Sequence, residues 1–281
     1  MVLSIQSHVA FGRVGNRSAV FPLELIGQEV VVINTVQFSN HTGYGEWTGD
    51  IFSARHIKNI LQGIEKRGGM ICDAVLSGYM GTPEIGEIII EAVDRVRACR
   101  QDAVYCLDPV MGDYGRGFFV HKEIPEFIKN EAVKKATIIT PNQFEAEYLA
   151  EMKINEISHA QEACRRIRSQ GPQIVLITSF QKDNDDKIIS MYLSDRGEDW
   201  IITTERLKFN ADPNGAGDLT AALFLGRFLQ SRNASDALGK MANSVYAVFE
   251  KTYNAKSREL CLVDSRFDIM EPAVRFEVLP V

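Results

Sequence analysis

The sequence has few cysteines, and they form no pattern that could hold a metal or a disulfide framework. The five cysteines are odd in number and scattered, with no Cys-x-x-Cys pair and no Cys/His cluster (Cys72, Cys99, Cys106, Cys164 and Cys261). Scattered thiols of this kind are typical of a reducing compartment. We therefore expect free, mostly buried cysteines and a cytoplasmic protein.

The sequence also lacks an excess of basic charge and a long apolar run. Its 31 basic and 37 acidic side chains leave a net charge of −6, which disfavours nonspecific binding to nucleic acid or to an anionic membrane. The most apolar late stretch, residues 219–229, is about half a membrane span and contains Arg227. We expect a buried helix there, no secretory signal at the N-terminus and no membrane partner.

Several common catalytic motifs are missing. There is no P-loop, and residues 7–16, which follow the first predicted strand, contain no Gly-x-Gly-x-x-Gly. These absences argue against P-loop NTPases and against NAD or FAD enzymes of the Rossmann type. Neither Gly-x-Ser-x-Gly nor His-Glu-x-x-His occurs, so serine hydrolases and zincins lose their simplest support.

What the sequence does contain is an alternation of short apolar runs and longer helical patterns, which predicts an α/β fold with a mostly parallel sheet flanked by helices on both faces. The nearly all-apolar runs predict buried strands at residues 2–5, 30–34, 74–76, 103–107, 137–140 and 174–178. Apolar spacings of three and four predict helices near residues 53–66, 84–98, 125–130, 142–152 and 158–170.

The pattern changes after residue 179. A polar run at 181–187 is followed by apolar stretches at 188–193 and 200–203, which predict an antiparallel hairpin. Two more helices, near residues 219–230 and 235–249, would close the core, and the last thirty residues look peripheral. Because no repeat or linker marks a boundary, we expect one domain over residues 1–281, a length that buries roughly three quarters of its unfolded surface.

Small or polar residues end nearly every predicted parallel strand. In chain order they are Ser7, Asn34 and Thr35, Ser77 and Gly78, Asp108, Thr140, and Thr178 with Ser179. Any one of them could be an ordinary turn residue. Since ligands of open α/β sheets bind outside the carboxyl ends of the strands, six such positions together indicate a site.

A glycine-rich segment, Gly215-Ala216-Gly217-Asp218, leads into the apolar helix that begins near residue 219. Glycines allow backbone amides to approach a ligand closely, and the first N–H groups of a helix are free to bind an anion. Asp218 could accept a proton from a substrate hydroxyl while these amides hold a phosphoryl group. Asp218 could equally be an N-capping residue.

A second segment, residues 140–147, combines a helix start with polar side chains. Thr140 as N-cap, Pro141 at the first helical position and Gln143 closing a capping box explain it structurally. Asn142 and Glu145 could also serve a phosphate and a hydrated Mg²⁺, which needs only one or two carboxylates. Asp108 could supply a second carboxylate, or could simply open a turn.

Taken together, these motifs resemble the pyridoxal kinases of the ribokinase-like superfamily over roughly residues 3–249. The most specific segment is Gln-Phe-Ser-Asn-His-Thr-Gly-Tyr at 37–44. The others match in family order, at residues 3–9, 77–79, 108–113, 139–147, 177–179 and 215–218. The resemblance implies a ribokinase-like kinase domain that phosphorylates the 5′-hydroxyl of pyridoxal, and of pyridoxine and pyridoxamine, with ATP in vitamin B6 salvage.

The resemblance also implies roles for individual residues. Asp218 would be the base, beside Gly215, Ala216 and Gly217. The acceptor would be bound by Ser7 and Thr42 at its polar edge, and by Val14, Val36, Phe38, His41 and Tyr79. ATP would lie along Asp108, Asp113, Thr140, Asn142, Glu145, Thr178, Ser179, Gly215 and Gly217.

The resemblance further implies a divalent metal (Mg²⁺) held by Asp108 and Glu145, and it allows a monovalent cation such as K⁺. It also implies a mobile lid at residues 112–117 and a homodimer. Two residues depart from the family pattern: Ala216 is more typical of sugar kinases, and Phe119 stands where animal relatives have tyrosine. A hydroxymethylpyrimidine kinase of the same fold and a noncatalytic protein that binds nucleotide or pyridoxal phosphate are the alternatives. Retention of Asp218 and Glu145 favours an enzyme.

Overall fold

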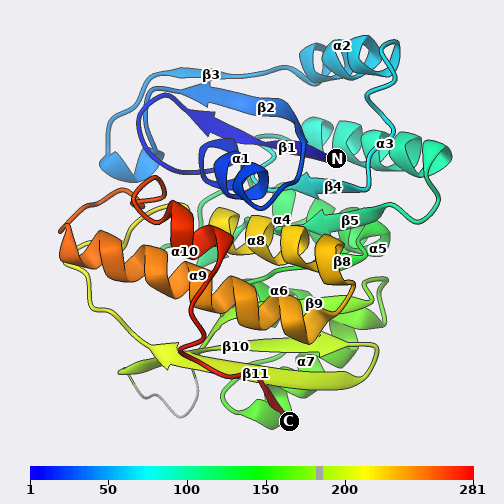
Figure 1. Cartoon of the computed structure of the whole chain (residues 1–281). Helices are drawn as coiled ribbons and strands as arrows, with labels where there is room; N and C mark the ends of the chain where they lie inside the picture. Colours follow the sequence, from blue (N-terminus) through cyan, green and yellow to red (C-terminus); the bar gives the residue numbers. More distant parts are fainter. Residues whose placement is uncertain (182–185) are drawn as a thin grey trace.

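The computed structural model describes residues 1–181 and 186–281, and most of the polar run at 181–187 lies outside them. A ten-stranded sheet runs through the molecule in the order β12-β11-β10-β9-β8-β5-β4-β1-β2-β3 (Figure 1). Its strands are β1 (Val2–Val9), β2 (Val30–Phe38), β3 (Gly49–Ile51), β4 (Ala74–Ser77), β5 (Val104–Leu107), β8 (Ile138–Ile139), β9 (Ile174–Phe180), β10 (Ile188–Asp195), β11 (Glu198–Glu205) and β12 (Leu279–Pro280). A separate hairpin pairs β6 (Gly112–Asp113) with β7 (Gly117–Phe118).

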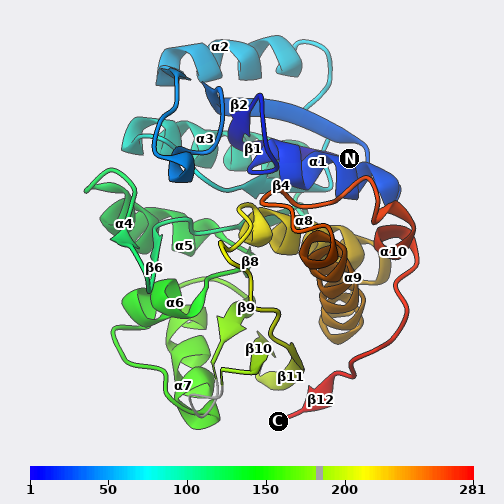
Figure 2. The same cartoon turned by 90° about the vertical axis from the view of Figure 1, so that its left-hand side faces the viewer.

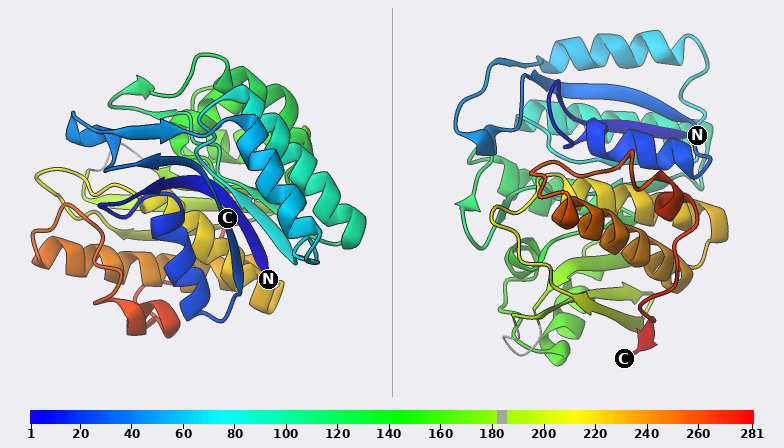
Figure 3. Two further views of the ribbon diagram at one scale, coloured as in Figure 1. Left: turned by 90° about the horizontal axis from the view of Figure 1, so that it is seen from above. Right: turned by 60° about the vertical axis from the view of Figure 1, so that its left-hand side comes forward.

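Helices cover both faces of the sheet (Figures 2 and 3). One apolar core lies under α1 (Asn16–Leu25), α8 (Ala216–Ser231) and α9 (Ala234–Asn254). The other lies under α2 (Ala54–Glu65), α3 (Pro83–Cys99), α6 (Gln143–Ala150) and α7 (Ile157–Arg168). The short elements are η1 (Thr42–Tyr44), α4 (Ile124–Phe127), η2 (Ile128–Ala132), α5 (Val133–Lys135) and α10 (Arg266–Met270).

The central strands form a parallel sheet because they are apolar on both sides. Every residue of β4 and β5 is buried, and alternate side chains of each strand enter the two cores. β10 pairs antiparallel with both β9 and β11. The predicted fold class, with an antiparallel part in the C-terminal half, is therefore confirmed. In the part of the chain that the structure describes, no helix has both the length and the apolar character to cross a membrane.

The prediction differs most from the structure near the N-terminus. Helix α1 was not predicted, because Pro22 inside it interrupts the helical pattern. β1 and β2 also run further than predicted, so Ser7 lies within β1, and Asn34 and Thr35 lie within β2. The register of β1 against β2 shifts between Gln6 and His8. This irregularity hides the strand end from a search for regular alternation.

The interpretation of the last thirty residues as peripheral is wrong for part of that segment. Leu260, Leu262 and Ile269 are almost completely buried in the core under α8 and α9. The chain leaves α9, passes below η1 and returns through α10 to the sheet edge at β12 (Figure 1). This segment therefore belongs to the packed structure and reaches the loops at the carboxyl ends of β1 and β2.

Candidate active site

Three carboxylates gather where β5, α6 and α8 meet. Asp108 follows β5, Glu145 lies in the first turn of α6, and Asp218 lies in the first turn of α8. Burial, with Glu145 and Asp218 nearby, raises the pKa of Asp108 well above its ordinary value. Burial also raises the pKa of Glu145 to about 7 and raises the pKa of Asp218. Burial and mutual repulsion thus disfavour the charged forms of these carboxyl groups.

Asp218 does not cap its own helix. The N-cap of α8 is Gly215, which makes no side-chain capping bond, whereas Asp218 Oδ2 accepts a hydrogen bond of 2.8 Å from the Gly15 N–H. This bond joins the start of α8 to the loop after β1 and opposes the burial that raises the pKa of Asp218. A carboxylate held in this way is oriented but keeps an oxygen for another proton donor.

Glycine is required at the two places where the backbones of this junction meet. At Gly15 (φ 54°), an added Cβ would lie 2.1 Å from the Ser7 carbonyl oxygen and 2.4 Å from Ser7 Oγ. At Gly215 (φ 87°), an added Cβ would lie only 1.8 Å from the Arg13 carbonyl oxygen. Close packing here brings Ser7, Gly15 and the start of α8 into one compact unit.

The start of α8 is suited to bind an anion. Gly217 is exposed, and a Cβ on it would lie 3.7 Å from Asp108 Oδ2, which shows how near the helix start is to the carboxylates. The first N–H groups of α8 have no partner within the helix, and the helix dipole places partial positive charge at this end. Donors for a phosphoryl group therefore lie beside a candidate base.

The residues expected to offer apolar surface to the acceptor do come together. Val14, Val36 and Phe38 are buried in one small cluster with Val9, and Tyr79 packs against them. Val14 directly precedes Gly15, whose N–H holds Asp218. The cluster therefore lies next to the candidate base, although its contact with a substrate stays a prediction.

The polar residues expected at the acceptor lie on neighbouring loops. Ser7 is half-buried at the irregular end of β1, and Thr42 is exposed at the start of η1. His41 caps η1, because its Nδ1 accepts a 3.1 Å hydrogen bond from the Gly43 N–H. Burial is the main cause that lowers the pKa of His41. These loops surround the apolar cluster from the side of β1 and β2.

The predicted capping arrangement of α6 is wrong by two residues. The N-cap is Asn142, not Thr140, and the capping box closes with Glu145, not Gln143. Thr140 is buried, and its N–H continues the sheet by bonding the Leu107 carbonyl at 3.1 Å. Gln143 instead bonds the Gln181 N–H through its side-chain oxygen at 3.0 Å.

Asn142 and Glu145 also bind the chain that follows Asp108. Asn142 Nδ2 donates to the Gly112 carbonyl at 2.8 Å, and Glu145 Oε1 accepts from the Met111 N–H at 2.9 Å. Glu145 Oε2 accepts from the Asn142 N–H at 2.9 Å. Glu145 Oε1 also accepts a longer bond of 3.5 Å from the Gly112 N–H, whereas Oε2 accepts, among the described residues, only from Asn142. Oε2 therefore keeps a lone pair that can accept a bond from metal-bound water.

The described residues contain no group of three or more His, Cys, Asp or Glu side chains that could hold a metal by themselves. The donors present are the oxygens of Asp108 and Glu145, and burial, followed by the neighbouring carboxylates, raises the pKa of Asp108. A hard divalent cation that keeps most of its waters suits such a place, because it needs only one or two carboxylates and would relieve their repulsion.

The other residues expected along ATP are more dispersed. Asp113 is tied within the β6–β7 hairpin, where it accepts from the Gly115 and Arg116 N–H groups and pairs with the Arg116 guanidinium. Thr178 and Ser179 are half-buried near the end of β9, and the Thr178 N–H bonds the Pro141 carbonyl at 2.9 Å. Phe119 is exposed after β7, with Arg116 over its ring at 4.5 Å.

Comparison with known proteins places the chain in a family. A family model described as phosphomethylpyrimidine kinase matches residues 28–261. The chain is 48% identical over 280 residues to a pyridoxal kinase of Rubrobacter xylanophilus, covering 99% of this chain and 96% of the relative. It is 43% identical over 279 residues to one of Corynebacterium diphtheriae, covering 99% and 98%. The chain belongs to the pyridoxal kinase family.

Solved structures agree with this assignment. The pyridoxal kinase of Leishmania donovani in complex with ADP and pyridoxamine has a TM-score of 0.92 and 32% identity, with 100% of this chain and 99% of that chain covered. A structure from Bacteroides thetaiotaomicron described as a phosphomethylpyrimidine kinase has a TM-score of 0.91 at 23% identity, which shows the fold alone. As a pyridoxal kinase, the protein is a phosphotransferase, and ATP-dependent kinases of this family work with a divalent metal.

Two residues of the site were missed by the sequence analysis. Gly15 had no motif to distinguish it, since its role is a backbone N–H and a close approach. Glu259 lies in the segment taken as peripheral, yet its carboxylate reaches both Arg13 and Tyr44. The local sequence gives no signal for either residue, because their contacts join chain segments about 200 or more positions apart.

Proposed function

We propose that this protein transfers the γ-phosphoryl group of ATP to the 5′-hydroxyl of pyridoxal, and of pyridoxine and pyridoxamine, in vitamin B6 salvage. The observation that carries the proposal is the Asp218 carboxylate, held by the Gly15 N–H at the start of α8 and next to the apolar acceptor cluster. The Leishmania relative was solved with ADP together with pyridoxamine or pyridoxine.

The residues act by positioning and by charge stabilisation, as phosphoryl transfer requires. Asp218 accepts the proton of the substrate hydroxyl as its oxygen attacks the γ-phosphorus in line. The bond between the γ-phosphorus and the bridging oxygen breaks, and ADP leaves. The N–H groups at the start of α8 donate to the transferring group, while partial burial, which raises the pKa of Asp218, makes it a stronger base.

ATP lies along the loops that follow β5, β8 and β9 in this proposal. Its phosphates face Thr140, Asn142, Thr178 and Ser179, with Asp113 in the lid hairpin nearby. Mg²⁺ at Asp108 and Glu145, with water completing its coordination, would neutralise the β- and γ-phosphates, which no lysine of these motifs does. A monovalent cation such as K⁺ stays a prediction from the resemblance.

Release of ADP with and without pyridoxal tests the proposal directly. Purified protein with ATP and Mg²⁺ is expected to release ADP many-fold faster when pyridoxal is added, with one pyridoxal 5′-phosphate formed per ADP. Pyridoxal binding without stimulated ADP release would favour the noncatalytic carrier instead.

The match to a phosphomethylpyrimidine kinase model favours hydroxymethylpyrimidine as the competing acceptor. Both acceptors are flat rings with a hydroxymethyl group, so the fold alone does not distinguish them. Side-by-side kcat/KM values decide, and we expect the larger value for pyridoxal. A larger value for hydroxymethylpyrimidine would overturn the substrate assignment but leave the kinase chemistry intact.

Alanine variants of Ser7 and Thr42 are expected to bind pyridoxal more weakly. Each loses one hydrogen bond to the ring, so KM for pyridoxal should rise roughly 2- to 10-fold. KM for ATP should stay within about twofold. Ser53→Ala is the matched control, because it also removes one serine or threonine hydroxyl, and Ser53 Oγ caps α2 by accepting from the His56 N–H. Equal increases in both KM values would contradict the assignment.

Removal of divalent metal is expected to lower turnover roughly a hundredfold, because several kcal/mol of charge stabilisation is lost. Excess EDTA should lower product formation, measured directly by chromatography, by that factor, and excess Mg²⁺ should restore it. Persistent turnover in metal-free buffer would show that Asp108 and Glu145 serve another purpose.

The broader assignments remain part of the proposal. We treat residues 1–281 as one kinase domain, because the N-terminal and C-terminal strands belong to the same sheet. All five cysteines are free thiols, which suits the cytoplasmic location that we propose. A homodimer stays a prediction from the resemblance.

A further inference from the structure

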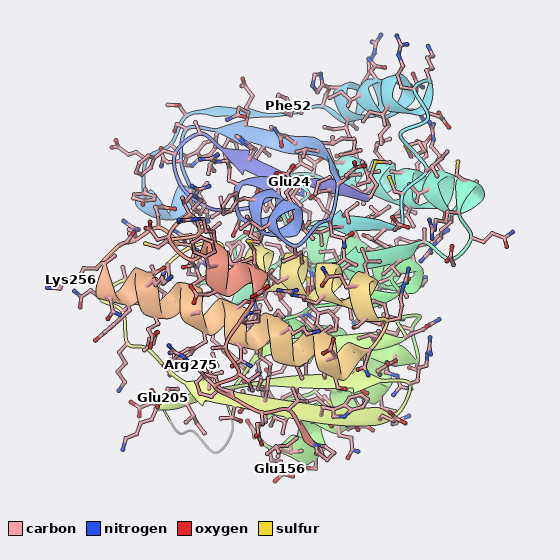
Figure 4. The ribbon with its side chains drawn as sticks, in the orientation of Figure 1. Glu24, Phe52, Glu156, Glu205, Lys256 and Arg275 are labelled. Carbon is pink, nitrogen blue, oxygen red and sulfur yellow. The ribbon has the colours of Figure 1, made fainter. Side chains whose placement is uncertain are left out.

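The segment just after α9 runs alongside the acceptor loops. α9 ends beside Lys256, which is labelled in Figure 4, and the chain then turns back below η1 (Figures 1 and 4). This turn is firmly anchored. The Ser257 N–H bonds the Thr252 carbonyl at 3.1 Å, the Glu259 N–H bonds Ser257 Oγ at 3.0 Å, and Leu260 is buried in the core.

Glu259 uses its two carboxylate oxygens on two different loops. Oε2 accepts a 2.7 Å hydrogen bond from the Arg13 N–H, in the loop after β1. Oε1 accepts a 2.6 Å hydrogen bond from the Tyr44 hydroxyl, at the end of η1. The first loop continues to Gly15, which holds Asp218, and η1 contains Thr42. One carboxylate therefore links the two loops expected to hold the acceptor.

The backbone around Glu259 is shaped to allow this approach. At Gly12 (φ 112°), an added Cβ would lie 2.9 Å from Glu259 Oε2. The backbone at Glu259 also forms a parallel bridge with Asn214, directly before the Gly215 turn that opens α8. Glu259 thus adjoins the base-bearing helix as well as the two acceptor loops.

The neighbouring Arg258 supports the same arrangement. Its Nη2 donates to the Gly43 carbonyl at 2.8 Å, and its guanidinium lies 4.0 Å from the centre of the Tyr44 ring. Burial and the Glu259 carboxylate raise the pKa of Tyr44 to about 12. The phenol therefore stays protonated and remains a donor to Glu259 across the neutral pH range.

We propose that Glu259 is a positioning residue for the reaction, which fixes η1 against the loop after β1 so that the acceptor is held at one distance from Asp218. This inference rests on the proposed function. Glu259 acts through Tyr44 and Arg13 rather than on the reacting atoms. The expected signature is a change in acceptor binding, with little change in ATP binding.

Four variants test this proposal. Glu259→Ala loses both links, so KM for pyridoxal should rise about tenfold or more, the size expected for lost hydrogen bonds to a charged group. Tyr44→Phe keeps the ring under Arg258 and loses one link, so a smaller increase is expected. The double variant should be no worse than Glu259→Ala alone, because the Tyr44 hydroxyl has no carboxylate left to bond once Glu259 is replaced. In Glu259→Gln, the amide oxygen can still accept from Arg13 and the NH₂ can donate to Tyr44 Oη, so KM should stay within about threefold of wild type.

Glu250→Ala is the matched control, since it removes a glutamate near the end of α9, the helix that precedes Glu259, and among the described residues this carboxylate pairs with Arg275 in an exposed 2.7 Å ion pair. It should leave both KM values unchanged. Additive effects of Glu259→Ala and Tyr44→Phe, or equal rises in KM for ATP and pyridoxal, would overturn the proposal. If Glu259→Ala does not fold, the outcome for Tyr44→Phe and Glu259→Gln still decides it. Wild-type protein without pyridoxal-dependent ADP release would overturn the proposed function itself, and this inference with it.

Discussion

Replacing Asp218 by asparagine is expected to lower kcat by about 10²- to 10⁴-fold, the range in which a well-placed general base contributes. Asparagine has nearly the same shape and can still accept the 2.8 Å hydrogen bond from the Gly15 N–H. It cannot take a proton from the substrate hydroxyl. The loss should therefore fall on kcat, while the dissociation constant for pyridoxal stays within a few-fold of wild type.

Asp236→Asn provides the control for position in a helix. Asp236 lies in the first turn of α9, three residues after the N-cap Asn233, just as Asp218 lies three residues after Gly215 in α8. Any general effect of removing a negative charge from a helix N-terminus should appear in both variants, at about 1 kcal/mol or less. Unchanged kcat is expected for Asp236→Asn. Wild-type turnover in Asp218→Asn would remove this residue from the mechanism.

Much of the fold could be predicted because its physical signals are local. Buried parallel strands are apolar along their whole length, and each predicted one is present. Helix α1 could not be predicted, because Pro22 lies inside it and its stability comes from packing on β1 and α8. The early end predicted for β1 has a similar origin, since its register against β2 shifts between Gln6 and His8.

The start of α6 shows why local pattern reading was insufficient at the site. Residues 140–145 contain two overlapping capping patterns, Thr140 with Gln143 and Asn142 with Glu145. The structure uses the second one. The choice depends on contacts with a distant loop, because Asn142 and Glu145 also bind Gly112 and Met111. When one residue both caps a helix and holds a distant loop, the sequence pattern alone does not separate the two roles.

Local patterns also fail to predict the contacts between segments that are distant in the sequence. The sequence identified Asp218 through its glycine-rich surroundings, but not the Gly15 N–H that orients it. Nor did it identify Glu259, which is more than 200 positions from both of its partners. Motifs thus located the groups expected to touch the substrates. The groups that hold those motifs together were visible only in three dimensions.

Gly215→Ala is expected to be the most damaging small substitution in the site. A Cβ there would lie 1.8 Å from the Arg13 carbonyl oxygen, so the loop after β1 and the start of α8 must separate. Separation would misplace Asp218 and the anion-binding N–H groups together, which predicts a loss in kcat/KM of roughly 10³-fold. The free energy of unfolding should fall by about 2–4 kcal/mol, from overpacking and from the positive φ of 87°.

Gly27→Ala separates the effect of overpacking from the effect of the positive φ. Gly27 also has a positive φ, 84°, but an added Cβ would meet nothing within 4 Å. It should therefore lose only the conformational part, about 1–2 kcal/mol, and keep full turnover. Thermal unfolding and steady-state kinetics on both variants check the prediction. If Gly215→Ala behaved like Gly27→Ala, the close packing of the loop after β1 against α8 would not be what positions the base. The orientation of Asp218 would then need another explanation.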